Sequence, residues 1–182
     1  MGRKVHPYGF RVGVTKDWQS KWYASTSQYA DLALEDKRLR DLIQKTLPDA
    51  GVSRVTVERN ANQITLTLFT AKPGIVIGRG GQNAELLRNL LQAATDKRVR
   101  LNIEEIRVPE LDAYLVARSV ADQLERRVAF RRAMKQSVQR TMQRGALGCR
   151  IKIGGRLGGA EMSRVEQELQ GQVPLHTLRA DI

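Results

Sequence analysis

Two stretches of this sequence bring together residues suited to binding phosphate. The first is Ile77-Gly78-Arg79-Gly80-Gly81, a glycine turn with a cation at its tip, set between two apolar runs with helical spacing. Glycine has no Cβ, so a nucleic-acid backbone can approach the main chain there, and the amides that open the following helix point at phosphate. We therefore take Gly78, Arg79, Gly80 and Gly81 as candidate RNA contacts, with an ordinary turn between two helices as the alternative.

The second stretch is residues 126–144, which hold seven cations and no acid. Arg127, Arg131 and Lys135 lie four residues apart, which predicts one helical face, and Arg132 lies beside them. Like charges at this spacing cost a helix about 0.2–0.5 kcal/mol per pair, and cations near a helix start oppose its dipole. A surface that serves only solubility normally mixes in acids. The pattern therefore favours a polyanion partner, contacted by Arg126, Arg127, Arg131, Arg132, Lys135, Arg140 and Arg144.

The N-terminal residues form a third basic stretch. Residues 1–24 carry five cations against one acid, and six of the nine aromatic residues lie within the first 29 positions. We predict an arm that becomes ordered on RNA, since cations hold phosphates and aromatic rings stack on bases. An arm packed on its own domain is the alternative, and we expect Trp18 and Trp22 to be buried. The candidate contacts are Arg3, Lys4, Arg11, Lys16 and Lys21.

Hydrophobic periodicity predicts the helices and strands that position these residues. It predicts a helix over 27–47, a hairpin over 55–68, a short helix before the glycine turn and a helix over 82–95. A strand over 99–103 follows, with a bulge or the strand end at 104–105. Residues 109–182 show two helices that meet near 128–130, then strands near 149–153 and 162–169. The fold class is α+β, with an arm (1–24), a domain (25–108) whose element order matches the KH module, and an α/β domain (109–182) of two helices on a sheet.

Composition excludes several classes of protein. The chain has 182 residues, a net charge of +12 and 41% hydrophobic residues, which indicates a folded, basic protein. A single cysteine, Cys149, excludes an internal disulfide and a multi-cysteine zinc site. His6 and His176 lie at opposite ends, and neither a catalytic motif nor a nucleotide-binding phosphate loop is found. We therefore expect no enzyme, cofactor, metal or membrane segment, and a cytoplasmic location. The remaining basic candidates for RNA contact are Arg150, Arg156 and Arg164.

Several longer strings make the chain resemble one family. They are residues 1–7, 72–78, 123–127 with 130–135, 155–161 and 173–182, which read MGRKVHP, KPGIVIG, QLERR with FRRAMK, GRLGGAE and VPLHTLRADI. Through these strings the chain resembles the bacterial-type ribosomal protein S-three family, and the strings are spread over its whole length.

The resemblance implies a type II KH domain followed by a separate α/β domain on the head of the small ribosomal subunit. It implies contacts with small-subunit ribosomal RNA and with proteins S-ten and S-fourteen, with S-two nearby, and no homo-oligomer in the assembled ribosome. For Arg131, Arg132 and Lys135 it implies a role at the messenger RNA entrance, where the messenger is gripped and duplexes are opened. The alternative is a free KH regulator of single-stranded RNA, or another nucleic-acid role outside the ribosome.

The sequence departs from the family pattern in three places. The family often has two lysines between the glycines of its turn, so Arg79-Gly80 predicts a weaker grip there. Residues 166–172 lack the usual arginines, which removes the expected contacts from Leu169 and Gln172. Family members also continue beyond residue 182, which implies a shortened chain with an incomplete second sheet.

Overall fold

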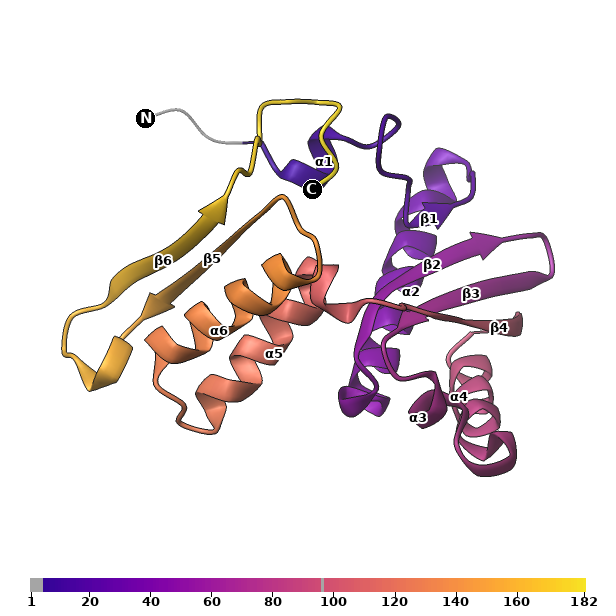
Figure 1. Ribbon diagram of the computed structural model, residues 1–182. Coiled ribbons are helices and arrows are strands. Elements are labelled where there is room, and N and C mark those ends of the chain that lie inside the picture. Colours follow the sequence, from indigo (N-terminus) through magenta and orange to yellow (C-terminus); the bar gives the residue numbers. More distant parts are fainter. Residues whose placement is uncertain (1–4, 96) are drawn as a thin grey trace. The chain divides into compact units, whose positions relative to one another are not determined.

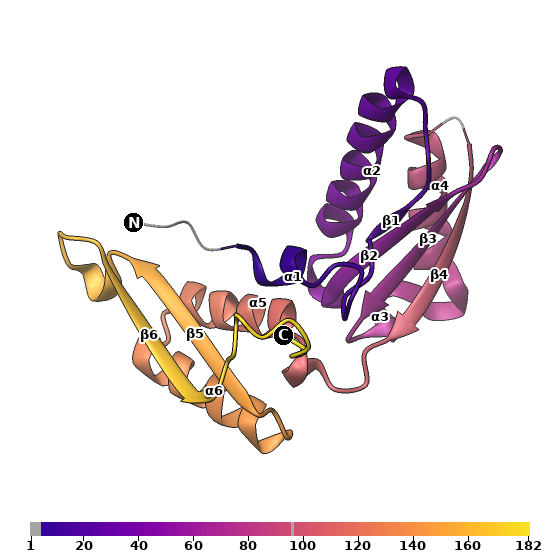
Figure 2. The same cartoon turned by 90° about the horizontal axis from the view of Figure 1, so that it is seen from above.

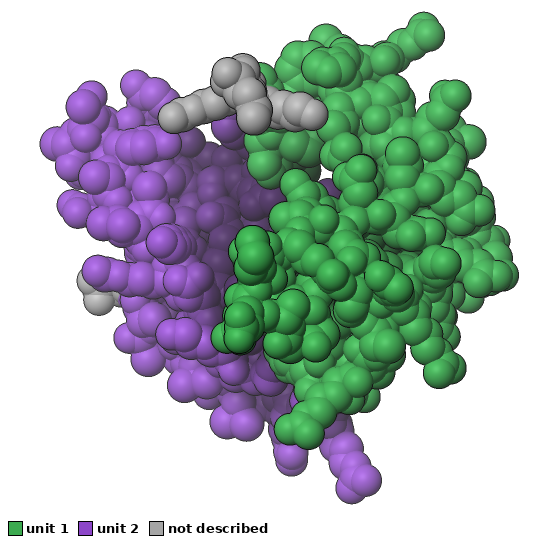
Figure 3. Space-filling view, turned by 90° about the vertical axis from the view of Figure 1, so that its left-hand side faces the viewer, with its two compact units in different colours: residues 1–17, 108–182 green, residues 18–107 purple. Residues whose placement is uncertain are grey.

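The computed structural model describes residues 5–95 and 97–182, which form two compact units. One unit comprises Trp18–Arg107, and the other comprises the described residues up to Asp17 together with Val108–Ile182. The two units are coloured separately in Figure 3. The sequence suggested a separate arm over 1–24, but its described residues are divided between the two units.

The Trp18–Arg107 unit is a four-stranded sheet with helices on one face. Its sheet order is β1-β2-β3-β4, in which β2 and β3 are antiparallel and the two outer pairs are parallel (Figure 1). The elements are β1 (Ser20–Lys21), α2 (Thr26–Thr46), the 3₁₀ turn η1 (Pro48–Ala50), β2 (Val52–Arg59), β3 (Gln63–Thr70), α3 (Pro73–Ile77), the 3₁₀ turn η2 (Arg79–Gly81), α4 (Gln82–Ala93) and β4 (Arg98–Glu105).

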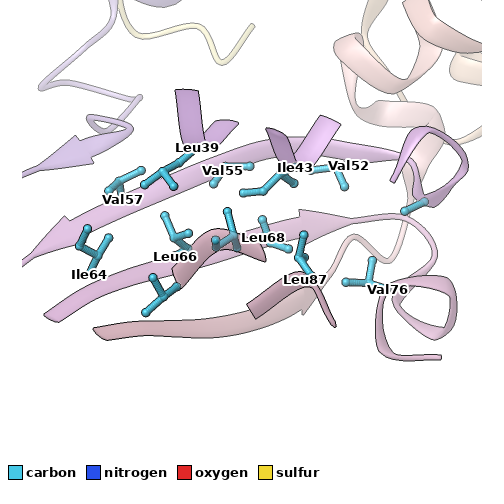
Figure 4. Packing of buried hydrophobic residues seen from close by; sticks show 13 residues of the cluster. Leu39, Ile43, Val52, Val55, Val57, Ile64, Leu66, Leu68, Val76 and Leu87 are labelled. Carbon is cyan, nitrogen blue, oxygen red and sulfur yellow. The ribbon is translucent and has the colours of Figure 1, made fainter. Parts of the chain in front are cut away.

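Strict alternation in β3 places its apolar residues in the core of this unit. In β3, Ile64, Leu66 and Leu68 are fully buried, while the residues between them face the other side of the sheet. Leu39 and Ile43 of α2, Val76 of α3, and Leu87 and Leu91 of α4 pack onto the same face (Figure 4). The sheet and the three helices therefore enclose one hydrophobic core.

A buried polar cluster holds the first strand against this core. Asp36 is 1% exposed, and its carboxylate accepts hydrogen bonds from the Ser20 hydroxyl, the Trp22 indole and the Arg59 guanidinium at 2.5–2.8 Å. Arg59 also pairs with Glu35 at 2.7 Å. A buried carboxylate is tolerated only when it is paired and hydrogen-bonded in this way. The cluster thus ties residues 20–22 to α2 and β2.

The second unit packs two helices on a β-hairpin. Helix α6 contacts both β5 and β6 as well as α5 (Figure 2). The hairpin pairs Gly148 with Gly171 at one end and Gly155 with Arg164 at the other. The elements are α1 (Pro7–Phe10), the 3₁₀ turn η3 (Pro109–Leu111), α5 (Ala113–Glu125), α6 (Phe130–Gln143), β5 (Gly148–Gly155), the 3₁₀ turn η4 (Leu157–Gly159) and β6 (Arg164–Gly171).

The predicted α+β class is confirmed, and two details of the prediction are resolved. Strand β4 stays in register with β3 through Glu105, so the change of pattern at 104–105 is the strand end rather than a bulge. The burial predicted for Trp18 is wrong, because its side chain is 66% exposed. Trp22 is half-buried and donates its indole N–H to Asp36.

Substitution Asp36→Ala should strongly destabilise the Trp18–Arg107 unit. It would remove one of the two carboxylates that compensate the burial of the Arg59 guanidinium, which is 4% exposed, and would leave only Glu35. Removing one member of a buried ion pair costs about 3–5 kcal/mol. Urea unfolding followed by tryptophan fluorescence measures this, because both tryptophans of the chain lie in this unit.

The matched control is Asp41→Ala, which removes the same charge from an exposed position on the same helix. Its urea midpoint should lie close to that of the unaltered chain. Equal midpoints for the two variants would contradict a central role for the Asp36 cluster.

Candidate nucleic-acid interface

Helix α6 separates an apolar face from a cationic face. Its buried residues are Ala133, Met134, Ser137, Val138 and Thr141. Arg131, Arg132, Lys135 and Arg140 are all exposed on the rest of the helix surface. The burial of the first set against α5, β5 and β6 fixes which way the second set projects. The structure therefore brings together the three cations that the sequence singled out at 131, 132 and 135.

Arg127 does not extend this helical face, contrary to the sequence prediction. It lies between α5 and α6 with φ +60°, the left-handed region that side chains other than glycine rarely adopt. Helix α6 begins three residues later, at Phe130. Arg126 and Arg127 are both exposed, so they contribute charge to the loop before the helix and not to the helix itself.

The first turn of α6 adjoins strand β6 through a group of charged and aromatic side chains. The Glu166 carboxylate lies 3.1 Å from Arg164 Nε and 3.7 Å from Arg131 Nε. Both guanidinium groups lie near the Phe130 ring, at 5.9 and 5.7 Å from its centre. The acid missing from residues 126–144 is thus supplied by another element. The sequence did not reveal this contact, since it depends on the packing of β6 on α6.

The glycine turn has the backbone that close approach to a ligand requires. Gly78, Gly80 and Gly81 have φ of +72°, +60° and +84°. A Cβ on Gly78 would lie 2.7 Å from Asn83 Cγ, whereas one on Gly80 or Gly81 would meet no atom within 4 Å. Gly81 is the N-cap of α4, so the cap residue has no side chain that could accept a hydrogen bond from the amides that open this helix. Arg79 is exposed at the tip.

Apolar side chains remain exposed on both sides of this turn. They are Ile75 (41%) and Ile77 (42%) on α3, and Leu86 (61%) and Leu90 (48%) on α4. These leucines contribute to the apolar spacing that predicts this helix, but its buried residues are Leu87 and Leu91. A cationic turn beside exposed apolar residues suits a single-stranded chain, with phosphates at the turn and bases on the apolar side chains.

The hairpin adds a basic surface on the side away from α6. Arg150 and Lys152 are both exposed and lie two residues apart on β5, so they share one face. Arg150 was predicted from the sequence and Lys152 was not, although the two-residue period of the strand identifies it. Arg156 is also exposed, and its guanidinium donates to the Ala160 carbonyl at 2.9 Å. Arg144 pairs with Glu110 at 3.4 Å.

The basic residues predicted to contact RNA near the N-terminus have different surroundings. Arg3 and Lys4 lie outside the described residues. Lys16 pairs with Asp181, with 2.5 Å between Lys16 Nζ and the carboxylate, and Lys21 is exposed on β1.

Arg11 is fully buried, and its guanidinium donates to the carbonyl oxygens of five described residues, Pro7, Pro174, Leu175, Thr177 and Ala180. All of these bonds lie within the protein. We therefore leave Arg11 out of the RNA-contacting set, since its charge is used to hold the C-terminal segment.

The described residues contain little else that could do chemistry. Burial raises the pKa of the Cys149 thiol, and a hydrogen bond with the Thr141 side chain lowers it in part. The result is a less reactive thiol in the packing between β5 and α6. No group of three or more potential metal ligands occurs in residues 5–95 and 97–182. Among the helices of the same ranges, none combines the length and apolar character that a membrane span needs.

Comparison with known proteins matches both parts of the chain to a protein family. Residues 38–111 match the family model of the KH domain, and residues 120–182 match that of the ribosomal protein S3 C-terminal domain. The whole chain is 57% identical to small ribosomal subunit protein uS3 of Listeria welshimeri, covering 83% of that protein. Identity is 57% to the uS3 of Dehalococcoides mccartyi and 55% to that of Desulforudis audaxviator, covering 66% and 84% of those proteins. The chain belongs to the uS3 family.

This result confirms the resemblance found in the sequence. A KH module followed by the uS3 C-terminal domain accounts for the α+β class, and the comparisons support RNA binding as the general activity. The uS3 proteins are structural and not enzymatic, which agrees with the lack of a catalytic motif in the sequence.

Substitution Arg11→Ala should loosen the C-terminal segment of this uS3 chain. The carbonyls of residues 174–180 would lose a charged donor, and each such bond is worth about 1.5–3 kcal/mol. Amide hydrogen exchange within residues 175–180 should accelerate about tenfold or more, since a tenfold change corresponds to about 1.4 kcal/mol.

The control variant is Arg38→Ala, which removes a cation from the exposed surface of α2 in the other unit. Exchange in residues 175–180 should not change in this variant. Unaltered exchange in Arg11→Ala would show that the carbonyl contacts do not hold the segment.

Proposed function

We propose that this chain is a structural constituent of the small ribosomal subunit, where it binds ribosomal RNA and contacts messenger RNA through Arg131, Arg132 and Lys135. The observation that carries the proposal is the surface of α6. Three cations lie within its first six residues, where they repel one another and Arg131 and Arg132 oppose the helix dipole. Glu166 offsets part of this repulsion through Arg131, and a polyanion would offset more of it.

The proposed action on messenger RNA follows from the same charges. Cations that hold the phosphates of a single strand lower the free energy of separated strands relative to a duplex. Movement of the messenger during translation then supplies the work of opening. This mechanism requires neither a nucleotide site nor a metal. It requires only that the side chains face the incoming strand, as they do if this surface of α6 lies at the messenger entrance.

Further contacts are proposed for the remaining basic surface. Arg150 and Lys152 on the hairpin suit ribosomal RNA, because arginine and lysine hold phosphate without regard to base sequence. We also propose, as the family resemblance implies, that proteins S-ten and S-fourteen are direct neighbours of this chain and that S-two lies nearby. The chain would occur as one copy per small subunit in the cytoplasm.

A second candidate function rests on the glycine turn. The space around a Cβ position on Gly80 and Gly81 is open, and exposed isoleucines and leucines flank the turn. These features favour binding of single-stranded RNA by the KH domain itself. A free KH regulator would rely on this turn, whereas a ribosomal constituent would rely on α6 and on the wider basic surface.

The double substitution Arg132→Ala/Lys135→Ala should weaken binding of single-stranded RNA and reduce its salt dependence. Each lost phosphate contact lowers the slope of log affinity against log salt by about 0.7 for a single strand. The measurement is a fluorescence anisotropy titration of the full chain with a labelled oligouridylate over a series of salt concentrations. The matched control is Lys37→Ala/Arg38→Ala, which removes two adjacent exposed cations from α2.

Equal salt slopes in the two double variants would overturn the assignment to α6. Small subunits that carry the α6 variant should translate through a messenger hairpin more slowly than subunits that carry the α2 variant. Co-sedimentation of both variants with small subunits at moderate salt separates assembly from messenger contact.

The substitution Arg79→Glu discriminates between the two candidate functions. It reverses the charge at the tip of the glycine turn and leaves α6 intact. A loss of oligouridylate affinity larger than that of the α6 variant would favour the KH regulator. An unchanged affinity, together with normal co-sedimentation, would favour the ribosomal function.

A further inference from the structure

We propose that Arg131 and Arg164 form a phosphate site that the Glu166 carboxylate occupies in the free protein, and that RNA displaces this carboxylate when it binds. The inference rests on the proposed function of α6 and extends it in two ways. It joins Arg164 of strand β6, one of the basic candidates, to Arg131 of α6 in a single site, and it makes Glu166 an internal competitor of the nucleic acid.

The geometry of the carboxylate supports this assignment. One oxygen, Oε1, lies 3.1 Å from Arg164 Nε, and the other, Oε2, lies 3.7 Å from Arg131 Nε. The two oxygens of one anion thus bridge two guanidinium groups from different elements. The non-bridging oxygens of an RNA phosphate present the same arrangement, and arginine binds carboxylate and phosphate through the same planar set of donors.

The cations are held in place by more than the ion pairs. Both guanidinium groups lie within 6 Å of the centre of the Phe130 ring, at 5.7 Å for Arg131 and 5.9 Å for Arg164. A cation near an aromatic face is attracted by the electrons of the ring. The ring therefore attracts both guanidinium groups independently of the Glu166 carboxylate.

Because the two arginines are exposed, another anion can replace the Glu166 carboxylate. The side chains of Arg131 and Arg164 are 71% and 50% exposed, so an incoming strand can reach both. Glu166 is 28% exposed. Ion pairs between exposed groups are weak because water and salt screen them, and the carboxylate carries one charge where a run of phosphates carries many. RNA can thus replace Glu166 at little cost.

The test is the isosteric substitution Glu166→Gln, with Glu168→Gln as the matched control. Glu168 lies two residues along β6, on the same face of the strand, and its substitution changes the net charge by the same amount. Oligouridylate affinity of the full chain is measured by fluorescence anisotropy. Glu166→Gln should raise the affinity about two- to fivefold, the range set by one weak ion pair, and Glu168→Gln should raise it less.

A double-mutant cycle shows whether the effect passes through the two arginines. In the background Arg131→Ala/Arg164→Ala, the gain from Glu166→Gln should fall to that of Glu168→Gln. The single substitution Arg164→Ala should weaken RNA binding about as much as Arg132→Ala does, although Arg164 lies on a strand. Thermal unfolding of each variant reports whether a loss of binding comes from a loss of structure.

Two results would overturn the inference. One is an equal effect of Glu166→Gln and Glu168→Gln, and the other is a gain that persists in the background without the arginines. If Arg132→Ala/Lys135→Ala still weakens binding in either case, the proposed function stands and only the phosphate site is lost. If that double variant binds as tightly as the unaltered chain, the proposed function itself fails.

Discussion

The second unit has to overcome the electrostatic repulsion among the cations of α6, and its packing is arranged around that requirement. Arg131, Arg132 and Lys135 lie within two turns, and the helix carries no acid of its own. The helix is nevertheless held by the burial of its other face, where Met134 and Val138 are 3% and 2% exposed. Hydrophobic burial of this kind outweighs pairwise repulsion of a few tenths of a kcal/mol. The hairpin and α5 are thus the supports that keep this charge concentrated.

The arginines of this chain differ in whether their charge is bound inside the protein or exposed at its surface. Arg59 and Arg11 are both buried. Arg59 binds a carboxylate and Arg11 binds carbonyl oxygens within the protein, so neither charge is available to a partner. Arg131 and Arg164 are exposed and share one carboxylate. Net charge alone does not distinguish these uses. The number of internal acceptors around each guanidinium does, because Arg131 and Arg164 keep capacity for a further anion whereas Arg11 and Arg59 do not.

Local periodicity explains how much of the fold was predictable from the sequence. Alternation in β3 and β5 and the apolar spacing in α2 and α4 identify those elements, because one buried face imposes a fixed period. The junction near 128–130 was also found, although the left-handed conformation of Arg127 was not. Exposure of Trp18 was missed, because propensity describes an average residue and not whether a particular surface is covered.

The candidate site was predictable only where its residues are neighbours in sequence. The glycine turn and the cations of α6 are each contiguous, so residue type and spacing were enough. The Arg131–Glu166–Arg164 group joins α6 to β6, and a sequence reading treats Glu166 as an ordinary surface acid. Its meaning comes from a contact across more than thirty positions, which depends on how the hairpin packs on the helix. Where cations are concentrated in one segment, the compensating acids are therefore to be sought on the elements packed against it.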